Sequence, residues 1–335
     1  MRNSFGNFLT VTLFGESHGT VIGAILDGLP AGLKVDLDFI QDDLARRAPR
    51  DSTATGRHEA DEVELSGGVF NGVTTGAPLC VVIANQDVRS GDYQQGQARP
   101  GHGDYTAFCK YQGFADYRGG GHMSGRLTAA LVAAGAIVKQ ALLQKGIVFA
   151  ARVTELGGSD RPEDFSRLLQ EAKSQGDSLG GVVELKITGV PKGAGEPWFD
   201  SVESVLSHVF FSIPAVKGVE FGAGFAMTEW RGSQANDGLY IQNGDVLTRT
   251  NHSGGIDGGI TNGMPITARI GFKPTPSIAK TQDSIDFLRQ ENIALQIRGR
   301  HDTAVVMRTP VIVENMAALA LADLLLQNFG PEWFR

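Results

Sequence analysis

The sequence is poor in cysteine and in positive charge. Its 2 cysteines, Cys80 and Cys109, are too few for a disulfide framework and do not form a Cys-x-x-Cys pair, so we expect reduced, structural thiols. Lys and Arg total 30 against 37 Asp and Glu, a formal net charge of -7. Because binding to a phosphate backbone needs a basic face, this balance argues against a nucleic-acid partner.

Leader segments and long apolar runs are also missing. The N-terminus lacks the basic start and the apolar stretch of a signal peptide. No apolar run reaches the ~18 residues that a membrane helix requires. We therefore expect a cytoplasmic protein with no membrane partner.

Several common catalytic motifs do not occur. The chain contains no Gly-Lys dipeptide, which excludes a Walker A loop, and no glycine cluster fits Gly-x-Gly-x-x-Gly after a strand. There is no His-Glu-x-x-His, and the 7 histidines show no zinc-ligand spacing. The sequence therefore predicts no metal site.

Glycine, in contrast, is abundant. The 44 glycines lie in short clusters between apolar runs, which indicates turns and close approaches of the backbone. Residues 8–14 and 79–84 have the composition of strands, and residues 38–47 that of a short helix. Residues 127–143 and 315–326 are apolar on nearly every face, which predicts buried helices. Helices of this kind indicate cover by sheets on more than one side.

A short segment occurs twice. Residues 66–78 align without gaps onto residues 253–265, with seven of thirteen positions identical and two more exchanging Val for Ile. Glycine-rich turns also converge by chance, but we favour duplicated halves, each with an equivalent turn before a strand. No linker separates them, so we expect a single domain over residues 1–335 with halves of roughly 1–150 and 151–335.

One catalytic motif is present near the start of the chain. Gly15-Glu16-Ser17-His18-Gly19 fits the Gly-x-Ser-x-Gly nucleophile elbow, so a serine hydrolase with Ser17 as nucleophile is one hypothesis. Its position argues against this, because an α/β-hydrolase places several strands upstream of its elbow and only one is predicted here.

Four segments concentrate His, Arg and Gly: residues 15–19, 99–105, 116–126 and 298–302. Any one of them could be an ordinary turn. Together they describe a pocket for a polyanion, because glycine lets the backbone approach a ligand and arginine donates in a fork that matches phosphate and carboxylate. The third segment also opens a helix, whose free amide groups attract anions. The histidines available for proton transfer are His18, His102 and His301.

These motifs resemble the signatures of the chorismate synthase family, in the family's order, over residues 4–327. The residues that carry the resemblance are Gly-Glu-Ser-His-Gly at 15–19, Arg-Pro-Gly-His-x-Asp at 99–104, Tyr-Arg-Gly-Gly-Gly at 117–121, Val-Lys-Gly-Val-Glu at 216–220, Asn-His-Ser-Gly-Gly-Ile at 251–256, Lys-Pro-Thr at 273–275 and Gly-Arg-His-Asp at 299–302.

The resemblance implies an α+β fold, a β-α-β sandwich with buried central helices between antiparallel sheets, in a homotetramer. It implies a lyase of the shikimate pathway that eliminates phosphate from 5-enolpyruvylshikimate-3-phosphate in a 1,4-anti sense, giving chorismate. The hydrogen lost from C6 is not acidic, and the family uses reduced FMN, which lends an electron and recovers it without net redox change.

Roles are implied residue by residue. His18 would protonate the departing phosphate, and His102 would hold the reduced flavin in its productive protonation state. Asp302, with Ser17 as relay, would help flavin N5 accept the C6 proton. The arginines implied to bind substrate are Arg47, Arg99, Arg126 and Arg300. The residues implied to contact FMN are His122, Met123, Ser124, Pro214, Ala215, Gly258, Lys273, Pro274, Thr275, Pro276, Ser277 and Arg300.

The chain departs from the family in two places. The family pattern Gly-Gly-Gly-Arg-Ser-Ser-Ala-Arg carries an arginine where this chain has His122. Near Thr53 the family carries another, and the alignment leaves open whether Arg50 or Arg57 compensates. The first change predicts weaker flavin binding or a preference for lower pH, and it suggests a third hypothesis, a non-catalytic flavin-binding relative.

The source of reducing power is open. NADPH could reduce the flavin on this chain, or an external reductase could supply it. The absence of a Rossmann fingerprint favours the external source.

Overall fold

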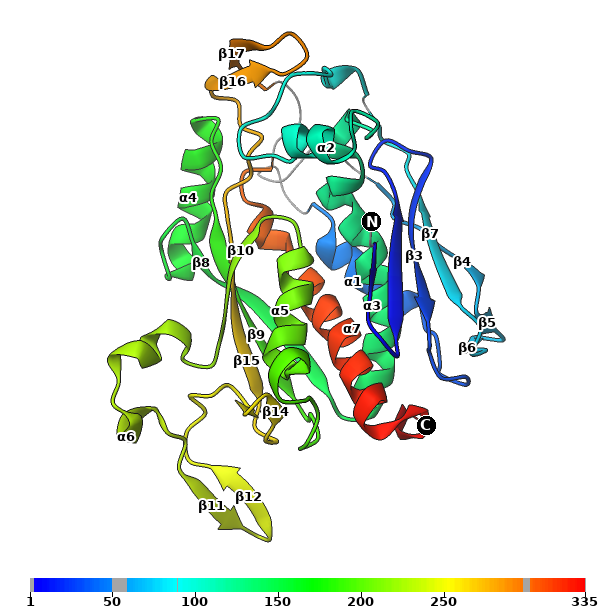
Figure 1. Cartoon of the computed structure of the whole chain (residues 1–335), viewed down its shortest axis with the longest axis vertical. Helices are drawn as coiled ribbons and strands as arrows, with labels where there is room; N and C mark the ends of the chain where they lie inside the picture. Colours follow the sequence, from blue (N-terminus) through cyan, green and yellow to red (C-terminus); the bar gives the residue numbers. More distant parts are fainter. Residues whose placement is uncertain (1–2, 50–58, 89, 298–301, 335) are drawn as a thin grey trace.

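The computed structural model describes residues 3–49, 59–88, 90–297 and 302–334. Two antiparallel sheets enclose a layer of helices, which makes the chain a β-α-β sandwich of the α+β class, as expected (Figure 1). The first half of the chain supplies one sheet and the second half supplies the other.

The first sheet has the strand order β1-β2-β3-β7-β4 and the second has the order β10-β15-β9-β8. The strands of these sheets are β1 (Ser4–Phe5), β2 (Thr10–Gly15), β3 (Val21–Asp27), β4 (Val63–Gly67), β7 (Leu79–Ala84), β8 (Val148–Leu156), β9 (Gly181–Thr188), β10 (Val216–Phe221) and β15 (Ile266–Phe272). The remaining hairpins are β5 (Val69–Phe70) with β6 (Val73–Thr74), β11 (Leu239–Gln242) with β12 (Asp245–Thr248), β13 (Ile256–Asp257) with β14 (Ile260–Thr261), and β16 (Gln282–Asp286) with β17 (Glu291–Leu295).

The central layer consists of α3, α7, α1 and α5 (Figure 1). The α-helices are α1 (Leu37–Arg47), α2 (Asp104–Lys110), α3 (Thr128–Gln144), α4 (Pro162–Ser174), α5 (Val202–Ser212), α6 (Gly232–Ala235) and α7 (Pro310–Phe329). Short 3-10 turns at Arg118–Met123 and Gly125–Leu127 lead into α3. The expected strand 79–84 and the helices expected at 38–47, 127–143 and 315–326 are all present, within a few residues at their ends.

The expectation that no stretch could span a membrane by length was wrong. Gly125–Gln144 and Pro310–Phe329 are long and apolar enough to do so. Each is 89% buried within the fold, which is what the core helix of a sandwich requires, because both of its sides pack against other elements. The helices α3 and α7 approach closely where Gly135 lies against Asn315, since a Cβ at residue 135 would stand 2.6 Å from the Asn315 backbone oxygen.

A cluster of charged side chains is buried between α1, α3 and α7. Lys139 Nζ lies 2.5 Å from Asp43 Oδ2 and 3.2 Å from Glu314 Oε2. Arg46 donates to both Glu314 oxygens at 2.7 Å. Asn315 Nδ2 donates to Asp43 at 2.8 Å. Each buried charge therefore has an opposite partner, which burial of an ion requires.

We expect Lys139→Met to destabilise the protein by roughly 3 kcal/mol, because removing one partner of a buried ion cluster leaves Asp43 and Glu314 undercompensated. Urea unfolding measures the change. The control is Lys186→Met on the exposed side of β9, which we expect to change the free energy of unfolding by less than ~0.5 kcal/mol. Equal losses in the two variants would contradict the importance of the cluster.

The repeated segments have the same structure. In β5–β6, Val69 pairs with Thr74 and Phe70 with Val73; in β13–β14, Ile256 pairs with Thr261 and Asp257 with Ile260. The hydroxyl of Thr74 donates to Pro30 at 2.6 Å, and that of Thr261 donates to Pro191 at 2.6 Å.

The surrounding strands follow the same pattern. Strand order β2-β3-β7-β4 in one sheet corresponds to β8-β9-β15-β10 in the other, and α3 and α7 follow the equivalent strands β7 and β15. We infer that the chain is one domain of two duplicated halves.

Two parts of the chain project from the sandwich. The hairpin β11–β12 extends from one end, and β16–β17 lies at the other end near α2 (Figure 1). The second hairpin is fastened to the segment before α2, because Ala98 N donates to Ile285 O at 3.1 Å and Phe287 N to Gly96 O at 2.9 Å. This end of the sandwich carries the candidate site.

Cys80 and Cys109 are both free, and Cys109 is exposed.

Candidate active site

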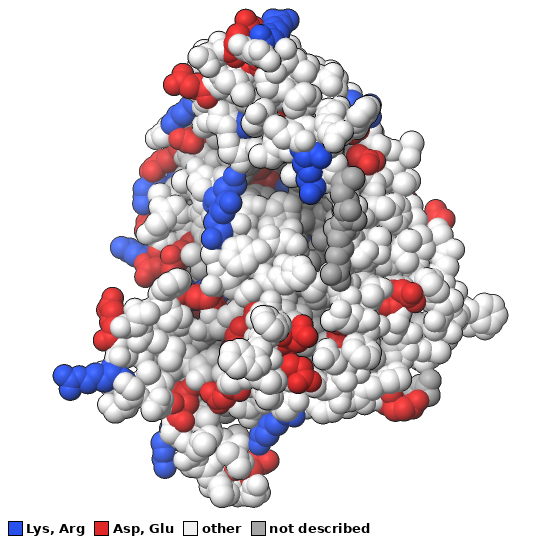
Figure 2. Space-filling view, viewed as in Figure 1, with Lys and Arg blue, Asp and Glu red and all other residues white. Residues whose placement is uncertain are grey.

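A cavity of about 680 Å³ lies between the two sheets. Its walls come from the loop after β2, the end of α1, the 3-10 turns before α3, the connection from α5 to β10, and the segment after β15. On the face drawn in Figure 2, Lys and Arg side chains stand at the rim of a hollow close to α2. A cavity of this size accommodates ligands of the size of a cofactor.

Most of the predicted site residues line this cavity. They are Ser17, Arg47, Arg99, His102, His122, Met123, Ser124, Arg126, Pro214, Ala215, Lys273, Thr275, Pro276, Ser277 and Asp302. They come from segments that are far apart in the sequence, and only the packing of the two halves brings them together.

Four predicted residues are not among those that line it. His18 contacts Gly119, and its ring lies edge-on to that of Tyr93 with 5.3 Å between the ring centroids. Pro274 is exposed, between two residues that line the cavity. Gly258 lies between β13 and β14, at the opposite end of β15 from Lys273. Seven strand residues span about 20 Å, so one chain does not bring Gly258 to this cavity. Arg300, like His301, Arg50, Thr53 and Arg57, lies outside the described residues.

Glycines 119 and 120 let two histidine-bearing loops meet. Both have a positive φ, 60° and 83°. A Cβ at Gly119 would stand 2.5 Å from the His18 ring and 3.0 Å from Ser17 Oγ, and one at Gly120 would stand 3.1 Å from His102 Cε1. The glycine run is therefore needed for contact between the loops as well as for the turn itself.

His102 is oriented by an acidic partner. Its Nδ1 lies 2.8 Å from Asp104 Oδ1 and 3.1 Å from Arg99 Nη2. Because the guanidinium donates to Asp104 through both Nε and Nη2, we assign the Nδ1 proton to the bond with Asp104. This tautomer leaves Nε2, on the Gly120 side of the ring, for a ligand.

The charge of Asp104 is fixed by the same contacts. Burial raises the pKa of this carboxyl, but hydrogen bonds from Arg99 and His102 outweigh burial and bring the pKa well below its ordinary value. Asp104 is therefore ionised throughout the neutral range and aligns both cationic partners.

The depressed pKa of Asp104 predicts an acid-dependent stability. The contribution is complete above the unfolded-state pKa of about 3.9 and is lost as the pH falls through the folded-state pKa, because the unfolded chain then binds the extra proton. We expect the stability margin of the wild type over Asp104→Asn, from urea unfolding at a series of pH values, to shrink below about pH 4. A margin that stays constant as the pH falls would contradict the pairing.

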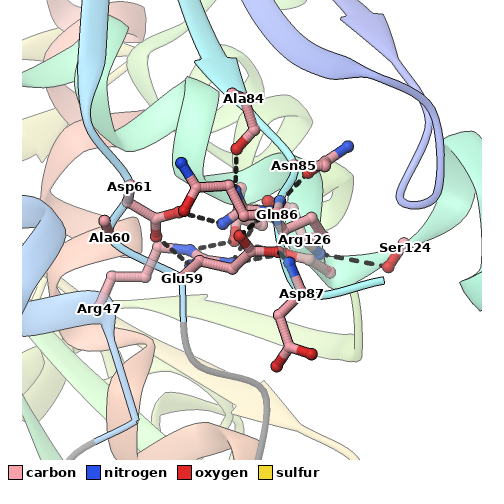
Figure 3. A network of polar contacts seen from close by, with 12 residues as sticks. Arg47, Glu59, Ala60, Asp61, Ala84, Asn85, Gln86, Asp87, Ser124 and Arg126 are labelled. Carbon is pink, nitrogen blue, oxygen red and sulfur yellow. Dashed lines mark hydrogen bonds and ion pairs between the residues drawn. The ribbon is translucent and has the colours of Figure 1, made fainter. Parts of the chain in front are cut away.

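Arg47 and Arg126 share one carboxylate (Figure 3). Asp61 Oδ2 accepts from Arg47 Nη1 at 3.4 Å, and Asp61 Oδ1 accepts a short hydrogen bond from Arg126 Nη1. Thr128 Oγ1 accepts from Arg47 Nε at 2.8 Å, and Asn85 Oδ1 accepts from Arg126 Nε at 3.0 Å. Hydrogen bonds to these protein acceptors therefore fix the position of both guanidinium groups.

Three further cations border the cavity. Arg308 donates to Asp302 Oδ2 from Nε at 2.9 Å and approaches the same oxygen from Nη2 at 2.8 Å. Lys273 Nζ donates to the Gly101 carbonyl, which ties the end of β15 to the loop that carries His102. Lys217 is exposed at the cavity edge. With the arginines, these groups give the cavity the positive field that an anionic ligand needs.

His122 is held by the opening loop. Its Nδ1 lies 2.8 Å from the Gly15 carbonyl oxygen, so Nδ1 carries the proton and donates. The side chain lines the cavity, and its Nε2 gains a proton and a positive charge only when the imidazole is protonated.

The geometry around Ser17 disagrees with a nucleophile elbow. Residues 16–20 connect β2 to β3, and Gly15 pairs with Ile22 in an antiparallel register. An elbow instead joins a strand to a helix. Ser17 is also 1% exposed. The serine hydrolase hypothesis is therefore wrong for this loop. Within the described residues, no group of three His, Cys, Asp or Glu side chains is placed to hold a metal ion.

Sequence reasoning missed several residues of the cavity. Asp104 and Lys217 lie inside segments recognised in the sequence, but neither was given a role. Arg308 follows Asp302 by six positions, and that spacing after Gly-Arg-His-Asp could have pointed to it. Nothing in the local sequence singled out Asp61, whose partners are 14 and 65 residues away.

Comparisons with known proteins show the family of the chain. A sequence model of the family described as chorismate synthase matches residues 9–326. A chorismate synthase of Chitinophaga pinensis is 46% identical and covers 97% of this chain and 96% of its own length. One of Dehalococcoides mccartyi is 44% identical, over 98% and 97%. A crystal structure of a chorismate synthase superposes with a TM-score of 0.76 at 30% identity, over 96% of this chain and 93% of the other. The chain belongs to the chorismate synthase family.

Proposed function

We propose that the protein catalyses the 1,4-anti elimination of phosphate from 5-enolpyruvylshikimate-3-phosphate to give chorismate. The observation that carries this proposal is the convergence of His102, Asp302 and the arginines on one cavity from distant segments of the chain. The substrate has one phosphate and two carboxylates, and this cavity has cations at several points of its wall.

Substrate binding is assigned to the arginine side of the cavity. Arg47 and Arg126 face it from α1 and from the turn before α3, and Arg99 faces it from the loop that carries His102. Fork-shaped donors suit both carboxylate and phosphate oxygens. Arg300 is proposed as a fourth, from its place in the Gly-Arg-His-Asp motif.

Proton transfer is assigned to four residues. His18 protonates the departing phosphate, and its position beside Gly119 and Tyr93 places it next to the cavity wall. His102 would hold the reduced flavin in its productive protonation state through Nε2, because Asp104 accepts the proton on Nδ1. Asp302, with Ser17 as relay, would help flavin N5 accept the proton lost from C6, and both residues line the cavity.

The remaining wall fits a flavin. Apolar side chains that suit a planar ring line one part of the cavity: Leu131, Phe211, Ile213, Pro214, Val216 and Val305. Thr275 Oγ1 is buried at the cavity and has no hydrogen-bond partner in the described structure. Buried hydroxyls are normally satisfied, so this atom is suited to a ligand. Bound reduced FMN would supply transient electron donation without net redox change, and Lys273 with residues 274–277 would hold it.

The decisive experiment is an anaerobic assay with reduced FMN and 5-enolpyruvylshikimate-3-phosphate. Appearance of chorismate and phosphate in equal amounts supports the proposal. FMN binding without product would support the non-catalytic relative instead. A second assay with oxidised FMN and NADPH tests whether this chain reduces its own flavin. We expect no product from NADPH alone, and product when an external reductase is added.

We further propose a homotetramer that works in the cytoplasm, a proposal supported by the family resemblance. Exposed aromatic side chains such as Trp198, Phe199 and Phe225, which are 84%, 91% and 78% exposed, offer apolar area for contact between copies. Sedimentation equilibrium measures the mass, and a monomer at micromolar concentration would contradict the tetramer.

The histidine at position 122 predicts weaker flavin binding than the family's arginine would give. An arginine carries a permanent positive charge that attracts the anionic FMN, so His122→Arg should lower the Kd of FMN. Fluorescence titration of the wild type and of His122→Arg at one pH measures the difference, with His122→Gln as the neutral control. A Kd in His122→Arg no lower than in the wild type would refute this prediction.

A further inference from the structure

We infer that Asp61 is a positioning residue for the substrate: its carboxylate bridges Arg47 and Arg126 and so fixes both guanidinium groups at the cavity wall. The inference rests on the proposed function for the identity of the anion and on the structure for the geometry.

The contacts of Asp61 join two elements. Arg47 is the last residue of α1, and Arg126 lies in the turn that opens α3. One oxygen of Asp61 accepts from each guanidinium group (Figure 3). All three residues line the cavity. A single carboxylate therefore sets the distance and angle between two cations from different parts of the chain.

The three side chains are deeply buried. Arg47 is 4% exposed, and Asp61 and Arg126 are each 7% exposed. Two guanidinium groups held this close repel one another, and burial strengthens the repulsion. One carboxylate between them offsets part of this repulsion.

The other protein contacts use Nε and Nη2 of each guanidinium. Arg47 donates to Thr128 Oγ1 and to the Gly125 carbonyl at 3.0 Å. Arg126 donates to Asn85 Oδ1 and to the Ala84 carbonyl at 3.4 Å. Asp61 is shared by both guanidinium groups, so its loss should change their alignment relative to each other at the cavity.

The backbone of Asp61 has a conformation that is rare for residues other than glycine and that recurs at binding sites. Its φ is 50°, in the left-handed region. Aspartate tolerates this conformation better than most side chains, although the conformation still carries strain.

The test measures substrate and phosphate binding in Asp61→Asn, which keeps the shape of the side chain and removes its charge. We expect KM for 5-enolpyruvylshikimate-3-phosphate to rise about tenfold or more, with a smaller fall in kcat. The Kd of inorganic phosphate, from calorimetry, should rise in parallel. In an Arg126→Lys background, the added effect of Asp61→Asn should be less than threefold, because its action runs through that guanidinium.

Controls separate positioning from general stability. Asp43→Asn removes a carboxylate that is equally buried and also bridges two cations, but lies away from the cavity. We expect it to lower the melting temperature without changing KM. Asp61→Glu keeps the charge and displaces it, so its KM should lie between those of the wild type and Asp61→Asn; if the asparagine variant does not fold, this variant decides.

The outcomes are distinct. Wild-type KM and phosphate Kd in both Asp61 variants would overturn the inference. Tighter phosphate binding by Asp61→Asn would also overturn it, because Asp61 would then compete with the ligand for the arginines. If the wild-type protein makes no chorismate, the proposed function fails, and the calorimetric phosphate measurement still decides the role of Asp61.

Discussion

Replacing His102 by alanine should lower kcat by roughly 10²- to 10⁴-fold, the range for loss of a positioned proton-transfer group, while the protein stays folded. The ring is placed by Asp104 and Arg99 on one side and by Gly120 on the other. Alanine removes the imidazole whose Nε2, on the Gly120 side of the ring, is left for a ligand in our assignment. Stopped assays of chorismate formation under anaerobic conditions measure the effect.

His208→Ala is the matched control for this prediction. His208 is exposed on α5 and stacks edge-on with Phe5 at 5.3 Å, outside the cavity. We expect wild-type kcat from this variant. His18→Ala, made separately, should also lower kcat. If both His102→Ala and His18→Ala kept near-wild-type turnover, the assignment of proton transfer to these residues would be wrong.

Gly119→Ala should lower kcat by about 10²-fold or more, because the new Cβ would stand 2.5 Å from the His18 ring and 3.0 Å from Ser17 Oγ. Both side chains must move, and a displacement of about 1 Å at a reacting group is enough for a loss of this size. The positive φ of 60° adds about 1–2 kcal/mol of backbone strain. A 10²-fold fall in kcat corresponds to about 2.7 kcal/mol of activation free energy, which exceeds this backbone strain.

Gly146→Ala separates the two effects. Gly146 also has a positive φ, 78°, but nothing lies within 4 Å of the position of its Cβ. It follows the end of α3, away from the cavity. We expect a similar fall in unfolding free energy with normal kcat. If Gly119→Ala were as active as Gly146→Ala, close packing of the loop against Gly119 would not be needed for turnover.

These predictions depend on contacts between loops that local sequence does not specify. His102 and Gly120 are 18 residues apart and meet because β2, β7 and α3 belong to one half of the sandwich. Lys273 reaches the same loop from the other half, through the Gly101 carbonyl. The site therefore lies at the interface between the two halves. The buried ion cluster around Lys139 stabilises the central helices next to this interface.

Much of the fold was predictable from the sequence because it depends on short-range patterns. Continuous apolar composition at 127–143 indicated a helix with no solvent-facing side, and α3 is buried along nearly its whole length. The repeated glycine-rich segment predicted equivalent hairpins, and the two have the same register. The glycine, arginine and histidine motifs indicated a pocket for an anion, since these residue types carry that chemistry wherever they meet.

The tertiary structure alone decided which of these residues act together. It brought Arg47 and Arg126 to Asp61, paired Asp302 with Arg308, and left Gly258 at the far end of β15. It also showed that residues 15–19 join antiparallel strands, which excludes the elbow. The physical reason is that periodicity and turn chemistry act over a few residues. Ion pairing in a buried site depends instead on the packing of the two halves, which sets distances between residues far apart in the chain.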